Sequence, residues 1–246
     1  MTGAEKILPY NNDECKSAQI GRMFDSIAGT YDALNHTLSL GIDKKWRSKG
    51  IACLRPFSPG LILDVATGTG DLAIAMYEAL NPIHITGVDI SEGMIAAGRI
   101  KAAEAGCSDG ITFELQDCLS LPYADDSFDA VTSAFGVRNF ENIEKGIAEM
   151  YRVLKPGGHL MILELSHPRQ FPVKQLYKLY SKTVIPCVGR LFSKENTAYH
   201  YLPASVRVVP QGGVMAGILR SQEFGNVVAR SLTLGICSLY TGEKMK

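Results

Sequence analysis

Apolar residues in the middle of the chain follow two spacings in turn. Short apolar runs predict buried strands, and the stretches between them have the spacing of amphipathic helices. The runs cover residues 61–66, 83–89, 111–115, 128–134 and 159–165. The clearest helical stretch places apolar residues three or four apart from Phe140 to Leu154, and a Lys-Pro-Gly-Gly sequence follows it. Strands that alternate with helices predict a parallel, doubly wound α/β sheet.

The two flanking regions have other patterns. Residues 1–16 are polar and predict a mobile lead-in. Residues 17–56 carry helical periodicity that is interrupted near Gly41, which predicts a cap of two helices. Residues 168–223 predict a helical insertion that covers the substrate site as a lid. The prolines expected to separate its helices are Pro172, Pro186, Pro203 and Pro210.

The end of the chain predicts a hairpin. Two strand-like runs lie around residues 227–234 and 236–240, with Gly235 between them. An antiparallel edge on a parallel sheet is a common arrangement. We therefore expect one domain over residues 1–246, with a mostly parallel, seven-stranded, Rossmann-like sheet and an antiparallel C-terminal edge.

The composition excludes several classes of protein. Hydrophobic residues make up 46% and charged residues 20% of the 246 positions, which is typical of a globular chain and not of a disordered or collagen-like one. No apolar run approaches the ~18 residues that span a bilayer, and residues 1–10 do not resemble a secretory signal. The six cysteines form no CxxC pair, so we expect reduced thiols and no metal site.

The charge is distributed unevenly along the chain. Residues 1–167 contain 14 basic and 22 acidic residues, a net charge of −8, whereas residues 168–246 contain 11 and 3, a net charge of +8. An anionic membrane face, an anionic substrate, nucleic acid or the acidic part of the chain itself could each match the basic part. No run of clustered lysine and arginine is present, which argues against nucleic acid.

Polar side chains follow three of the predicted strands at their carboxyl ends, where open α/β sheets bind ligands. The first strand runs into a glycine-rich turn, and its glycines let the backbone pass close to a ligand. Asp89 ends the second strand, where a carboxylate can bind both ribose hydroxyls. Asp117 and Cys118 follow the third strand and are placed to bracket an adenine. The candidate cofactor-binding residues are Asp64, Thr67, Gly68, Thr69, Gly70, Asp89, Asp117 and Cys118.

The turn between Asp64 and Asp71 distinguishes between two cofactors. It lacks the third glycine of the GxGxxG dinucleotide fingerprint, and no P-loop sequence follows. Its acidic ends would repel a pyrophosphate but would accommodate a cationic sulfonium that bears an amino group. The turn therefore favours S-adenosylmethionine over a nicotinamide dinucleotide.

Several segments resemble the S-adenosylmethionine-dependent class I methyltransferases. They are residues 64–71, 87–89, 121–129 and 152–158. Three further segments are similar to the ubiquinone/menaquinone biosynthesis C-methyltransferase family. They are residues 24–47, 133–140 and 199–205. The resemblance extends over about residues 18–246, nearly the whole chain.

This resemblance implies a reaction. In that family the methyl group of S-adenosylmethionine goes to a ring carbon of demethylmenaquinol, a polyprenyl naphthoquinol, giving menaquinol and S-adenosylhomocysteine. Thr69, Asp89 and the Asp117–Cys118 pair match the family's cofactor contacts, whereas Ala134 replaces a serine found in many relatives and is left out of the site. The alternatives are 2-polyprenyl-6-methoxy-1,4-benzoquinol as the acceptor, or a non-catalytic S-adenosylmethionine-binding scaffold.

The chemistry of a quinol suggests roles for three residues. A phenol ionises near pH 10, and an opposite charge nearby lowers such a pKa by about 1–3 units. We hypothesise that Arg138 stabilises the developing phenolate, that Asn139 orients a quinol oxygen and that Tyr31 closes over the site. Each has a structural alternative: an ion pair for Arg138, a helix cap for Asn139 and core packing for Tyr31.

The isoprenoid tail of such a substrate lies in a membrane. Access therefore implies contact with a bilayer surface, for which the basic C-terminal part is the candidate. The apolar and aromatic residues expected in this contact are Phe171, Leu176, Tyr177, Tyr180, Val184, Ile185, Leu191 and Phe192. A lid with solvated lysines is the alternative. We expect a cytoplasmic protein, peripheral at the inner face of the membrane, without a nucleic-acid partner, and leave a homodimer open.

Overall fold

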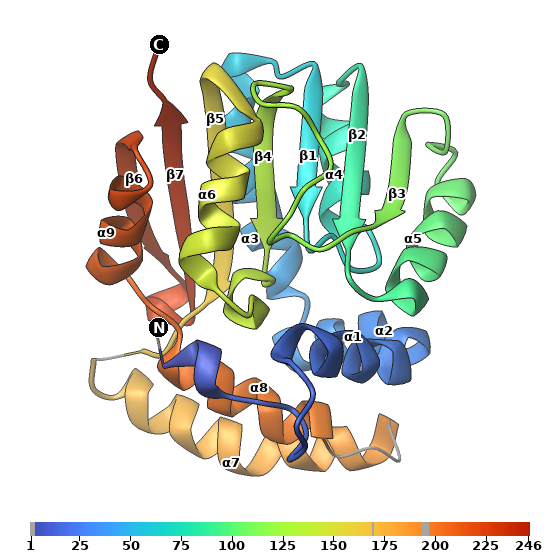
Figure 1. The fold of residues 1–246 in the computed structure, drawn as a ribbon. Coiled ribbons are helices and arrows are strands. Elements are labelled where there is room, and N and C mark those ends of the chain that lie inside the picture. The colour runs from blue at the N-terminus through green and yellow to red at the C-terminus, as the bar shows by residue number, and fades with distance from the viewer. Residues whose placement is uncertain (1–2, 169, 193–196) are drawn as a thin grey trace.

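The computed structural model describes residues 3–168, 170–192 and 197–246, which contain one seven-stranded sheet (Figure 1). Its strands are β1 Leu61–Val65, β2 His84–Asp89, β3 Ile111–Leu115, β4 Phe128–Ala134, β5 Leu154–Leu165, β6 Phe224–Leu232 and β7 Cys237–Lys244. They lie in the order β3-β2-β1-β4-β5-β7-β6. The first five strands pair in parallel, and β7 is antiparallel to both β5 and β6. This confirms the expected doubly wound sheet with an antiparallel C-terminal edge.

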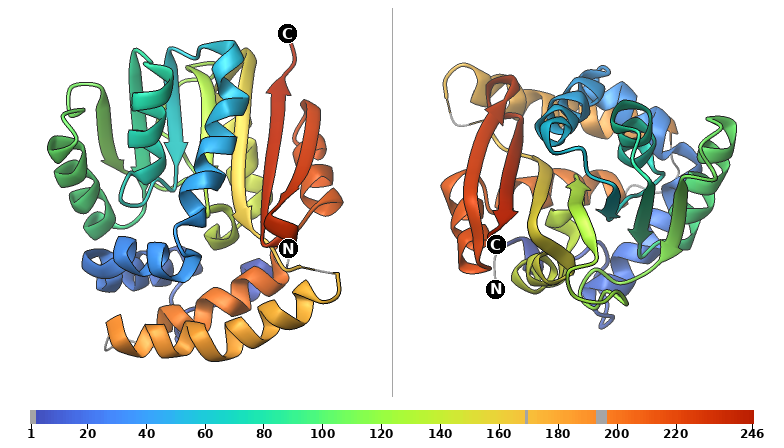
Figure 2. Two further views of the ribbon diagram at one scale, coloured as in Figure 1. Left: turned by 180° about the vertical axis from the view of Figure 1, so that it is seen from behind. Right: turned by 90° about the horizontal axis from the view of Figure 1, so that it is seen from above.

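Helices cover both faces of the sheet, and each face has its own core. The helices are α1 Lys16–Ile27, α2 Tyr31–Ser39, α3 Ile42–Leu54, α4 Asp71–Leu80, α5 Glu92–Glu104, α6 Ile143–Val153, α7 Val173–Phe192, α8 Thr197–Val208 and α9 Gly213–Ser221. α3, α4 and α5 pack on one face, and α6 and α9 on the other (Figures 1 and 2). Because both faces are covered, the central strands β1 and β4 are buried along nearly their whole length.

The fifth strand begins earlier than expected. α6 ends at Val153, and β5 starts at Leu154, which pairs with Phe128 before a shift in register. The Lys-Pro-Gly-Gly sequence after α6 therefore lies within the strand and does not form a loop. Similarly, β6 begins at Phe224, three residues before the expected hairpin run.

The N-terminal part differs from the prediction in two ways. The predicted break at Gly41 is present as a left-handed turn at Leu40 and Gly41 between α2 and α3, but the part contains three helices instead of two, because the 3-10 helix Ala28–Thr30 separates α1 from α2. Part of the lead-in packs on the fold, since Ala4 is fully buried in the core on the α6 face. Two of the four prolines expected to separate the helices of the insertion do not do so, because Pro186 and Pro203 lie inside α7 and α8, whereas Pro172 and Pro210 lie outside the helices.

A layer of helices lies across the carboxyl ends of the parallel strands (Figures 1 and 2). It consists of α1, α2, α7 and α8, with α2 against α7 and α1 against α8. Within the described ranges, no helix combines the length and the apolar character needed to cross a membrane. The layer covers the edge of the sheet at which the sequence places its candidate residues.

Candidate functional site

The turn between β1 and α4 brings the backbone close to this edge. Gly68 and Gly70 have left-handed conformations, with φ of +58° and +79°. A Cβ atom on Gly70 would lie 2.6 Å from Cζ of Phe113, so this position requires glycine for its conformation and for space. α4 begins at the next residue, and its first backbone N–H groups have no partner within the helix.

Asp64, at the end of β1, is a buried carboxylate with two hydroxyl partners. It accepts hydrogen bonds from Oγ1 of Thr67 at 2.7 Å and from Oγ1 of Thr132 at 2.6 Å. Burial nevertheless raises the pKa of Asp64 to about 6. At neutral pH Asp64 is therefore mostly ionised although it is shielded from water, and a cationic ligand would stabilise the charged form.

Asp89 joins the second strand to the glycine-rich turn. Its carboxylate accepts the backbone N–H of Gly68 at 2.9 Å and that of Ser91 at 3.0 Å. Burial raises the pKa of Asp89, although these backbone donors oppose the rise. A carboxylate has about four acceptor positions, so capacity remains for a ribose hydroxyl.

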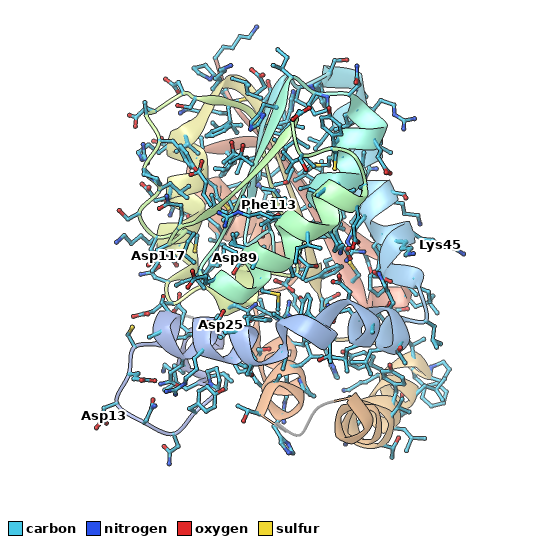
Figure 3. The ribbon with its side chains drawn as sticks, turned by 90° about the vertical axis from the view of Figure 1, so that its right-hand side faces the viewer. Asp13, Asp25, Lys45, Asp89, Phe113 and Asp117 are labelled. Atoms are coloured by element: carbon cyan, nitrogen blue, oxygen red, sulfur yellow. The ribbon has the colours of Figure 1, made fainter. Side chains whose placement is uncertain are left out.

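A first pocket of about 660 Å³, partly open to solvent, lies beside Asp89. It is lined by residues that include Ile20, Phe24, Tyr31, Asp89, Met94, Gln116, Asp117, Cys118 and Asn139. Figure 3 shows Asp89 and Asp117 close to each other, above α1 and its Asp25. Asp25 accepts hydrogen bonds from Oγ of Ser91 and the N–H of Gly93, and so ties α1 to the start of α5. The acidic and apolar lining suits a nucleoside.

A second pocket of about 1060 Å³, also partly open to solvent, adjoins the first. Its lining includes Tyr31, Leu38, Trp46, Asp64, Phe135, Arg138, Leu165, Tyr177, Tyr180, Leu202 and Ile236. Both pockets are bordered by Tyr31, Ala66, Gly68, Ala134 and Phe135. A group held in the first pocket can therefore face a flat apolar molecule in the second.

Arg138 is the buried cation of the second pocket and belongs to an ion pair. Its Nη1 lies 2.8 Å from Oε1 of Glu164, and its backbone N–H donates to Oε2 at 2.9 Å. Nη1 also donates to the carbonyl of Phe135. Burial lowers the pKa of Arg138, but Glu164 together with Tyr31 and Tyr201 outweighs burial, and the net shift is upward. Nε of Arg138 has no hydrogen-bond partner among the described residues and is available as a donor.

Asn139 lies in a different pocket from Arg138, and Tyr31 lies where the two pockets meet. Asn139 lines the first pocket, and its buried Oδ1 lacks a partner in the described part of the chain. Asn142, and not Asn139, caps the helix that follows. Tyr31 borders both pockets and packs edge-on against Phe24, with ring centroids 5.8 Å apart. Burial raises the pKa of Tyr31, so its hydroxyl stays protonated.

The far end of the glycine-rich turn is tied to the helical cap. Oγ1 of Thr69 donates to Asp32 at 2.6 Å, which leaves its backbone for a cofactor contact. Asp71 pairs with Arg47 at 2.8 Å and with Lys101. Burial would raise the pKa of Asp71, but these cations outweigh it and hold the pKa low. Of the two acidic ends of the turn, Asp64 and not Asp71 therefore has negative charge left for a ligand.

Sequence reasoning missed Glu164 and Arg47. The acid within the apolar run of β5 was the available signal for Glu164. Arg47 ends the 24–47 segment of the family resemblance, but no role was assigned to it. Arg47 lines the second pocket and pairs with Asp43 at 2.6 Å. Among the described residues, His36, Asp43 and Asp71 are close enough together for a metal ion, but Arg47 already donates to both carboxylates.

Comparisons with known proteins agree with this geometry. Residues 12–244 match the ubiE/COQ5 methyltransferase family. A Bacteroides fragilis protein named demethylmenaquinone methyltransferase is 56% identical over 240 residues, 98% of each chain. A Geobacter sulfurreducens protein named ubiquinone/menaquinone biosynthesis C-methyltransferase UbiE is 45% identical over 97% of this chain and 93% of its own. A solved S-adenosylmethionine-dependent methyltransferase from Thermotoga maritima shares the fold, with a TM-score of 0.65, 18% identity, and 91% and 99% coverage.

Proposed function

Because the chain belongs to the ubiE/COQ5 methyltransferase family, we propose that it transfers a methyl group from S-adenosylmethionine to a ring carbon of demethylmenaquinol, giving menaquinol in menaquinone biosynthesis. The names of its relatives support this acceptor. The observation that carries the proposal is the second pocket. Its apolar and aromatic lining suits a flat quinol ring, and Arg138 supplies a buried cation beside it.

The residues of the first pocket fit the cofactor. Asp89 has remaining acceptor capacity for a ribose hydroxyl, and Oδ1 of Asn139 is a buried acceptor without a partner among the described residues. Asp64 presents its desolvated carboxylate at the border of the second pocket, where it would attract a cationic group. When bound, S-adenosylmethionine supplies an electrophilic methyl group on a sulfonium.

Arg138 would act on the acceptor. Ring carbons of a quinol become nucleophilic when an adjacent hydroxyl loses its proton, and this phenol ionises near pH 10 in water. The N–H at Nε of Arg138 would donate to that oxygen as its charge develops, which favours the phenolate. Tyr31, between the pockets, would hold the ring in line with the methyl group, and close positioning of this kind contributes much of the rate.

The acceptor can be tested directly. Purified protein is incubated with methyl-labelled S-adenosylmethionine and either reduced demethylmenaquinone or the reduced 2-polyprenyl-6-methoxy-1,4-benzoquinone in detergent. The proposal predicts faster labelling of the naphthoquinol. Faster labelling of the benzoquinol would move the protein to the ubiquinone pathway, and no labelling of either would contradict a quinol acceptor.

We also propose that α7 contacts the membrane from which the substrate is taken. Phe171, Leu176 and Leu179 are 80%, 63% and 62% exposed, with the exposed Lys174 and Lys178 among them. Such a surface suits anionic lipid. The expectation was wrong for Tyr177 and Tyr180, which line the second pocket, and Tyr180 donates to the carbonyl of Leu38. The side chains of Ile185, Leu191 and Phe192 lie outside the described residues.

Flotation with anionic liposomes at low salt tests this contact. The double variant Leu176→Ser/Leu179→Ser should bind the liposomes less than the wild type. Val214→Ser is the matched control, because Val214 is 62% exposed on α9, away from α7. Equal flotation of all three proteins would remove α7 from the contact.

A further inference from the structure

Lys16, at the start of α1, is a buried lysine at the end of the segment that was expected to be mobile. The residue is 3% exposed. Its Nζ donates to three backbone carbonyls: Ala4 at 2.8 Å, Arg138 at 3.2 Å and Phe140 at 3.3 Å. Two of these belong to the turn that carries Arg138 and Asn139, more than 120 residues along the chain.

That turn depends on partners from elsewhere. It is a short 3-10 helix, Val137–Asn139, that follows β4. Glu164 holds the side chain and the backbone N–H of Arg138 from the side of β5. Lys16 holds the backbone carbonyl of the same residue from the side of α1. A buried carbonyl that loses its donor is costly to leave unpaired, so the turn would shift to find another partner.

The N-terminal segment also contacts the residues that follow the 138–140 turn in the sequence. Glu5 accepts the backbone N–H of Ile143 at 2.9 Å, and the N–H of Ser17 donates to Glu141 at 2.9 Å. The charged groups that act on Lys16 are Glu5, Arg138 and Glu141. Burial lowers the pKa of Lys16 to about 8, so it is mostly an ammonium ion at neutral pH. Its bonds to the carbonyls are charge-assisted.

We propose that Lys16 is a positioning residue for methyl transfer, which holds the 138–140 turn so that Arg138 lines the second pocket and Asn139 the first. This inference rests on the proposed function. Displacement of a reacting group by about 1 Å can cost a hundredfold in rate. Loss of Lys16 should therefore lower kcat about 10- to 100-fold. The Kd of S-adenosylmethionine should rise by a smaller factor than kcat falls, because this turn supplies only part of the first pocket and separate elements hold Asp89 and Asp117.

The test compares Lys16→Met with Lys6→Met, a control at an exposed lysine of the same segment. kcat is measured well below the melting temperature of each variant, and cofactor Kd by calorimetry. Lys6→Met should match the wild type, and Lys16→Arg, which keeps a charged donor, should recover part of the lost kcat. Wild-type kcat in Lys16→Met, or no recovery by arginine, would overturn the proposal.

Hydrogen–deuterium exchange gives a second readout that needs no acceptor. Uptake over residues 135–143 should rise in Lys16→Met and not in Lys6→Met. If the wild type fails to methylate demethylmenaquinol, the proposed function fails, and this exchange still decides the role of Lys16. Unchanged uptake would overturn the proposal. If Lys16→Met does not fold, Lys16→Gln, which keeps a shorter N–H donor, is measured in the same way.

Discussion

The ion pair between Arg138 and Glu164 allows the structural and chemical roles of Arg138 to be separated. The two side chains are 6% and 2% exposed, and Glu164 also accepts the backbone N–H groups of Arg138 and Leu165. Glu164→Leu would leave a guanidinium ion buried without its counter-charge. Arg138→Met/Glu164→Leu would remove both charges and replace them with apolar side chains.

The expected magnitudes follow from this burial. Removal of one partner of a buried ion pair typically costs 3–5 kcal/mol, so we expect Glu164→Leu to lose about that free energy of unfolding. For a chain of this size, each kcal/mol lowers Tm by about 2–4 °C, which gives a drop of roughly 6–20 °C. Replacement of both partners by apolar residues is often neutral, but Glu164 also accepts two backbone N–H groups, which lose this acceptor in the double variant. The double variant should therefore recover only the part of the loss that comes from the unpaired charge.

Urea unfolding followed by circular dichroism measures the stabilities, and labelled methyl transfer measures the activity. We expect the double variant to be more stable than Glu164→Leu, and to lack turnover because the cation of the second pocket is gone. A loss below about 1 kcal/mol in Glu164→Leu would contradict the energetic reasoning. Turnover in a stable double variant would show that Arg138 takes no part in the chemistry.

Three further predictions concern the cofactor side of the site. Asp89→Asn should weaken S-adenosylmethionine binding about 10- to 100-fold in calorimetry, because hydrogen bonds to a charged group are lost; Asp109→Asn, at an exposed acid, is the control. The pKa of Asp64 is raised to about 6, so its protonated form stabilises the fold at low pH and this stabilisation is lost as the pH rises through 6. As the pH rises from 4 to 6, the unfolding free energy of Asp64→Asn should therefore increase by about 3 kcal/mol relative to that of the wild type. A difference between the two proteins that stays constant with pH in urea titrations would contradict this. Gly70→Ala should lower Tm and abolish cofactor binding, because its Cβ would meet Phe113, and normal binding would show that the turn adapts.

Much of the fold could be predicted because its determinants are local in sequence. Apolar runs with helical spacers gave the parallel sheet, and glycines marked the turn in which Gly70 has no room for a side chain. The strand ends also placed Asp64 and Asp89 at one edge, where the structure finds them.

The remaining features depend on contacts between distant segments. Lys16 meets the 138–140 turn across more than 120 residues, and a polar lead-in gives no sign of such a contact. Asp71 is neutralised by cations from two other helices, so its charge could not be judged from the turn alone. Arg138 and Asn139 are neighbours in the sequence but line different pockets, and this depends on the side-chain directions within one short turn.

The central claim is methyl transfer to carbon, and the chemical position of the transferred methyl group tests it most directly. The protein is incubated with ¹³C-methyl-labelled S-adenosylmethionine and reduced demethylmenaquinone, and the product is examined by NMR. The account predicts a labelled methyl group on the naphthoquinone ring carbon. A label on a quinol oxygen, or an unlabelled quinone in the presence of bound cofactor, would contradict it.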